Sequence, residues 1–103
     1  MTGFFLRYEM ENKELPELIS SFLKTSGEDS TLLRTKIYHS VLDLLIHNTT
    51  FLYQVLYRID VEEEKVKKAF FDNPLAELAA ERITELIISR QLEKIQWRKR
   101  YSE

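Results

Sequence analysis

The sequence contains no cysteine and only two glycines and two prolines among its 103 residues. The lack of cysteine excludes disulfides, thiolate metal ligands and cysteine nucleophiles. The scarcity of glycine and proline argues against a sheet protein, whose many turns depend on these residues. Two glycines also leave little from which to build a glycine-rich phosphate loop. We therefore expect a few long helices, no cofactor and no enzymatic activity.

The sequence also lacks a long apolar run and a large net charge. Its most apolar stretch, residues 37–59, includes Asp43, His47 and Gln54, whereas a membrane span needs about 18 nearly unbroken apolar residues. The first residues show no basic region followed by a long apolar segment, so no secretory signal is predicted. The net charge of -2 gives no overall attraction to nucleic acid or to an anionic membrane. We expect a cytoplasmic protein without membrane association.

What the sequence does contain is typical of one folded domain, residues 1–103. Hydrophobic residues make up 44% and charged residues 31% of the chain, and aromatic residues are plentiful. This composition is that of a globular protein rather than a disordered one. The length suffices for one core.

Apolar residues repeat at three- and four-residue steps, which is helical periodicity. The first such segment covers 14–25, with Pro16 near its start and Gly27 after its end. The second runs from about residue 30 to residue 60. A break at the poor helix formers of residues 48–50 is conceivable. The apolar stripe keeps its phase across them, however, so we expect one helix of about 28 residues, roughly 40 Å long.

Two further helices are predicted near the end of the chain. Asp60 and Glu63 have the spacing of a capping box for a short helix that ends at about Phe71. Asn73 and Pro74 then suit the cap and first turn of a last helix, which reaches about residue 100. Residues 1–11 are ambiguous because their apolar residues fit both strand and helix periodicity, and helix is favoured.

These elements predict an all-α fold: a small bundle of two long antiparallel helices and two shorter ones, most simply as a homodimer. A compact chain of this length has a diameter of about 35 Å, which two helices of about 40 Å exceed. Two short helices cannot cover every apolar side of both long ones, and exposed apolar patches are rare on soluble monomers. We therefore expect a second copy, or another helical protein, to cover the remainder.

The interface candidates lie on the two long helices. Asn48 stands near the centre of an apolar stripe, where a buried amide can pair with its symmetry mate, although a bond to nearby backbone or water, or a local helix break, is the favoured explanation. In the last helix a second apolar side opposes the first. The candidates are Ile46, Asn48, Tyr53, Ile88, Leu92 and Ile95.

Two other groups of residues suggest chemistry, each weakly. His39, Asp43 and His47 follow one another at four-residue steps on one helix edge and are weak metal candidates. The two histidines are about 12 Å apart along the helix axis and cannot share one ion without further ligands. A solvated Asp–His pair is the simpler interpretation.

The basic end of the last helix suggests nucleic-acid binding, through Arg98, Lys99 and Arg100, with Trp97 directly before them and Tyr101 directly after them. Cations are common late in helices because of the helix dipole, and Trp97 has the phase of the apolar stripe and is expected to pack. The leading hypothesis is therefore a self-associating protein-protein interaction or scaffolding module. A small nucleic-acid-binding or regulatory protein is the alternative.

Overall fold

The computed structural model describes residues 14–25 and 31–102. Within these ranges the chain is all-α, without strands, as predicted. The helices are α2 (Glu14–Lys24), α3 (Thr31–His47), α4 (Thr49–Arg58), α5 (Glu63–Phe71) and α6 (Ala76–Ser102). The ambiguous segment 1–11 and the helix stop at Gly27 lie outside the described residues.

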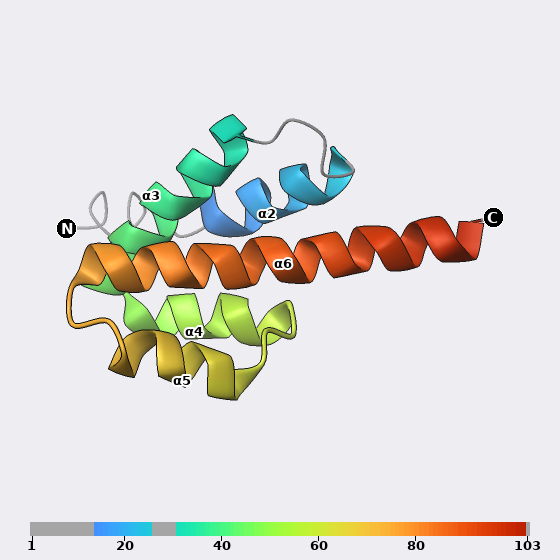
Figure 1. Cartoon of the computed structure of the whole chain (residues 1–103). Coiled ribbons are helices and arrows are strands. Elements are labelled where there is room, and N and C mark those ends of the chain that lie inside the picture. The colour runs from blue at the N-terminus through green and yellow to red at the C-terminus, as the bar shows by residue number, and fades with distance from the viewer. Residues whose placement is uncertain (1–13, 26–30, 103) are drawn as a thin grey trace.

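Helix α6 forms the axis of the molecule (Figure 1). Helices α2 and α3 pack on one side of it, and α5, with α4 beside it, lies on the other. The 27 residues of α6 span about 40 Å, and the molecule measures 51 Å along its longest axis and 33 Å along the next. In Figure 1, α6 runs past all the other helices, and its last turns lie beyond their ends.

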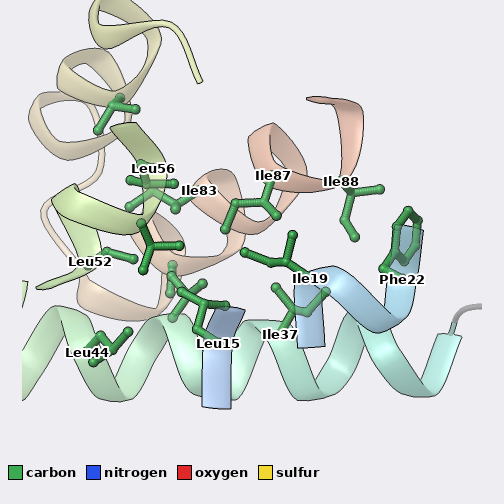
Figure 2. Close-up of a cluster of buried hydrophobic side chains, with 14 of the residues drawn as sticks. Leu15, Ile19, Phe22, Ile37, Leu44, Leu52, Leu56, Ile83, Ile87 and Ile88 are labelled. Carbon is green, nitrogen blue, oxygen red and sulfur yellow. The ribbon is translucent and has the colours of Figure 1, made fainter. Parts of the chain in front are cut away.

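The core lies where the apolar sides of the helices meet α6 (Figure 2). Helix α2 begins with Pro16 in its first turn, where a missing N–H costs no hydrogen bond. Its buried side chains, three and four residues apart, point toward α3 and α6. From the other helices come Ile37 and Leu44 of α3, Leu52 and Leu56 of α4, and Ile83, Ile87 and Ile88 of α6.

The long second helix predicted from the sequence is wrong, because the chain breaks at Asn48. This residue has φ -154° and ψ 71°, and its Oδ1 accepts a hydrogen bond from the Phe51 N–H at 3.2 Å. It is the N-cap of α4. The Asn48 N–H also donates to the Leu44 carbonyl at 2.7 Å, which completes α3. One residue thus ends one helix and begins the next, and the expectation of two long antiparallel helices fails with it.

Two predicted helix caps also differ from the structure. Asp60 does not form a capping box: it has a positive φ of 61°, and the N-cap of α5 is Glu62, which makes no side-chain cap bond. Asn73 does not cap α6 either. Its Nδ2 donates to the Ala69 carbonyl at 2.8 Å and so covers the end of α5. Both helices nevertheless occur close to where they were predicted.

Candidate functional site

The weak metal candidates lie on the exposed side of α3. Nε2 of His47 is 3.8 Å from Oδ1 of Asp43, and both side chains are more than half exposed. The ring of His39 instead contacts Tyr38 edge to face, with 5.2 Å between ring centroids. Among the described residues, no group of three or more potential ligands surrounds a possible ion position. The geometry therefore fits a solvated Asp–His pair better than a metal centre.

The predicted interface residues do not lie together. Ile88 and Ile95 are buried in the protein's own core, because α2 and α3 pack over this part of α6. Ile46 and Leu92 are exposed on α3 and α6. Tyr53 of α4 is stacked on Phe70 of α5, with 5.2 Å between ring centroids.

Asn48, the remaining interface candidate, uses its side-chain carbonyl for the α4 cap. Of the two explanations that the sequence left open, the structure supports the local one, with a helix break and a bond to nearby backbone. An amide already engaged in this way is a poor choice for a symmetric pair across an interface.

The basic residues at the end of α6 point in different directions. Consecutive residues of an α-helix are about 100° apart around its axis, so Arg98, Lys99 and Arg100 cannot form one flat patch. Nη2 of Arg98 donates to the Leu23 carbonyl at 3.0 Å, and so holds the C-terminal turn of α2. Arg100 instead shares a shallow groove of about 360 Å³ with Glu93, Gln96 and Trp97.

The most unusual surface feature is an aromatic pair on the last turns of α6. Trp97 and Tyr101 are 62% and 77% exposed, and their ring centroids are 5.4 Å apart. The sequence predicted that Trp97 packs in the core, and this is wrong. Its phase does place it near the apolar stripe, but the last turns of α6 lie beyond the ends of the neighbouring helices in Figure 1. Residues 96–101 are all exposed.

We call this surface the Trp97 face; it comprises Glu93, Gln96, Trp97, Arg100 and Tyr101. The Trp97 face begins just past the point where the turn between α4 and α5 contacts α6. One turn earlier, Nε of Arg90 donates to the Ile59 carbonyl at 3.2 Å, and its Nη1 bonds to Oε2 of Glu93 at 3.0 Å. Arg90 thereby ties the turn between α4 and α5 to α6, and past this contact the same side of α6 has no helix over it in Figure 1.

No family model, no curated protein and no solved structure matches this chain. Within the described ranges, none of the helices combines the length and apolar character that crossing a membrane requires. What can be said of the role of the Trp97 face therefore comes from its own geometry and chemistry.

Proposed function

We propose that this protein is a non-enzymatic helical interaction module that self-associates through the Trp97 face of α6. The observation that carries the proposal is the contacting pair of Trp97 and Tyr101, exposed on a part of α6 that extends beyond the bundle. Aromatic side chains supply much of the energy of protein interfaces when they become buried. A partner surface that covers Trp97 and Tyr101 would remove the apolar surface of both rings from water and so stabilise the complex.

The charges around the aromatic pair favour a second copy as the partner. The groove beside Trp97 contains one acid, Glu93, and one base, Arg100. A surface with both signs is not specific for a polyanion, but it can be complementary to itself. The rest of α6 serves as a rigid support, because its first two thirds are held in the core.

The test is the concentration dependence of the molecular mass, measured by sedimentation velocity between about 10 µM and 1 mM. The variant W97A/Y101A should remain monomeric where the wild-type protein associates. Trp97 is the one tryptophan of the chain, so its fluorescence emission should move to shorter wavelength as the wild-type protein is concentrated and the ring is buried.

A matched control is available in the same molecule. Phe71 is 86% exposed at the end of α5, just before the chain enters the first turn of α6, whereas the Trp97 face lies on the last turns. The variant F71A removes exposed aromatic surface at the other end of α6 and should associate as the wild-type protein does. A wild-type protein that is strictly monomeric at 1 mM, with unchanged fluorescence, would refute the proposed function.

Nucleic-acid binding is the second candidate, because Arg100 lies beside an exposed tryptophan that could stack on a base. Only one of the three consecutive basic residues, however, shares this face. If binding to single-stranded oligonucleotides is measurable at low salt, falls steeply with salt concentration and is lost in the variant R98A/K99A/R100A, this candidate is supported. No binding at 20 mM salt would exclude it.

A further inference from the structure

The arrangement of charges on the Trp97 face is specific enough to predict how two copies would meet. Glu93 lies four residues before Trp97 and Arg100 three residues after it. At about 1.5 Å per residue, they are about 6 Å and 4.5 Å from Trp97 along the helix axis, in opposite directions. At about 100° per residue, both are rotated from Trp97 in the same sense, by about 40° and 60°. The groove that Glu93, Trp97 and Arg100 line together agrees with this geometry.

We infer that two copies pair through antiparallel α6 ends, with the two-fold axis at Trp97 and with Glu93 of each copy bonded to Arg100 of the other. This inference rests on the proposed self-association and specifies its geometry. A two-fold axis perpendicular to two antiparallel helices brings equal flanks of the helices together. Along the axis, the acid of one copy is then within about 1.5 Å of the base of the other.

The symmetric arrangement forms two ion pairs, one on each side of the central tryptophans. In a parallel arrangement in the same register, opposite flanks of the two helices would meet, so that Glu93 would face Lys94 of the other copy and Arg100 would face Tyr101. The pairing of Glu93 with Arg100, the two charged residues that line the groove beside Trp97, belongs to the antiparallel arrangement and distinguishes the two. Glu93 can take part because its bond to Arg90 uses Oε2 and the side chain is 59% exposed.

The opposite flank of the Trp97 face is compatible with the same register. Lys94 lies three residues before Trp97 and Tyr101 four residues after it, both rotated in the other sense. The antiparallel pair would thus bring the Tyr101 ring of one copy to Lys94 of the other. The stem of a lysine packs well on an aromatic ring, and its ammonium group is attracted to the ring face.

The shape of the molecule also leaves space beside the end of α6 for the α6 helix of a second copy. The side of α6 in question is covered up to Arg90, which bonds to Ile59 in the turn between α4 and α5. In a register centred on residue 97, Ser102 of the second copy, the last residue of α6, would lie level with Leu92 and so close to that turn. Each α6 end would fill the space next to the other's α4–α5 layer. Two helical segments of about 12 residues make a small interface, so we expect weak association, with a Kd on the order of 10–1,000 µM.

A charge-reversal experiment tests the register directly. In E93R homodimers both pairs become base against base, and in R100E homodimers both become acid against acid. Each variant alone should associate at least about fivefold more weakly than the wild-type protein at 20 mM salt. An equimolar mixture of the two variants should associate again, because both pairs of the mixed dimer are complementary. Sedimentation velocity with one variant fluorescently labelled would measure the mixed dimer.

The outcomes separate this inference from the proposed function. If the wild-type protein does not associate, the proposed function fails and the inference with it. If the wild-type protein associates but the mixture of variants is no better than each variant alone, the function stands and the antiparallel register is wrong. Thermal unfolding followed by circular dichroism should show that both variants are folded, since E93R also replaces a partner of Arg90.

A second measurement avoids placing a positive charge beside Arg90, as E93R does. The chain has no cysteine, so the single substitutions E93C and R100C introduce unique thiols. Under mild oxidation, a mixture of the two variants should form disulfide-linked dimers of one copy of each at least about tenfold faster than either variant alone links to itself. Faster linkage of E93C to itself would indicate another arrangement and overturn the inference.

Discussion

Gln91 is an unusual residue in the core of α6. It is 1% exposed, and in the described part of the chain its Nε2 has no hydrogen-bond partner. A buried amide nitrogen that makes no hydrogen bond costs about 1–3 kcal/mol relative to a paired one. Thr84, the other buried polar residue nearby on α6, differs in this respect because its Oγ1 donates to the Ala80 carbonyl at 2.7 Å. Gln91 thus has a stability cost that a residue without polar atoms would avoid.

We predict that Gln91→Met raises the free energy of unfolding by about 1 kcal/mol. Methionine is unbranched and of similar length, so it can occupy the same space without a polar group. Urea denaturation at a low protein concentration would measure the change. The control is Gln54→Met on the exposed side of α4, which should change stability by less than about 0.5 kcal/mol. A stability loss at position 91 would show that the amide has a role in the fold.

At the scale of single elements, Asn48 decides the path of the chain. Because α3 ends and α4 begins at this residue, α4 can fold back beside α5 instead of continuing the line of α3. Thr49 contributes at the same point, since its Oγ1 donates to the Leu45 carbonyl at 3.1 Å and covers a carbonyl near the end of α3. The side chains of both residues replace backbone bonds that a continuous helix would make.

We predict that Asn48→Ala lowers the free energy of unfolding by about 1 kcal/mol, because alanine cannot accept the bond from the Phe51 N–H. Asn48→Ser should retain most of the stability, since serine is also a good N-cap. Chemical denaturation of the two variants, compared with Thr50→Ala at an exposed position, would measure the difference. Equal stability of the alanine and serine variants would show that the cap bond contributes little.

The helices themselves could be predicted from the sequence much better than the connections between them. The helix predicted over 14–25 matches α2 within one residue, because apolar residues repeat every three or four positions in it. The short helix predicted from an Asp60 cap to about Phe71 ends where α5 ends, but its N-cap is two residues later, at Glu62. The break at Asn48 was missed because residues 44, 48 and 52 keep the same spacing on both sides of it. Periodicity indicates which side of a helix is apolar. It cannot reveal a helix break when the spacing of the apolar residues is the same on both sides of the N-cap.

The polar residues at helix ends could not be assigned from the sequence for a related reason. An asparagine can accept from the first N–H groups of the following helix or donate to the last carbonyls of the preceding one. Asn48 uses its oxygen in the first way, and Asn73 uses its nitrogen in the second. The choice depends on the direction in which the chain turns, which is a property of the tertiary structure.

At the scale of the whole molecule, the structure changes where uncovered apolar surface lies. The sequence placed it along two long helices, but the break at Asn48 allows α4 to bury its apolar side within the bundle. The long helix that remains, α6, extends past its neighbours and leaves Trp97 uncovered. Phase alone could not predict this, because it gives the side on which a residue lies and not whether another helix reaches that far along the axis.

The projecting end of α6 should therefore contribute to association and little to folding. We predict that a chain ending at residue 96 remains folded, with a free energy of unfolding within about 1 kcal/mol of the full chain, and no longer self-associates. Residues 97–101 are all exposed, so their removal takes little apolar surface out of the core. The expected cost comes from the bond between Arg98 and the Leu23 carbonyl and from the basic residues near the helix end.

Thermal unfolding and sedimentation velocity on the same samples would test both parts of this prediction, with Arg98→Ala in the full chain as the matched control. That variant should account for most of the lost stability while it keeps the self-association. A fall in Tm of more than about 10 °C on truncation would mean that the end of α6 supports the core, because 1 kcal/mol corresponds to about 4–8 °C for a domain of this size. If the shortened chain still associated, the contact surface would have to lie elsewhere, and the exposed Ile46 on α3 would be the next residue to replace.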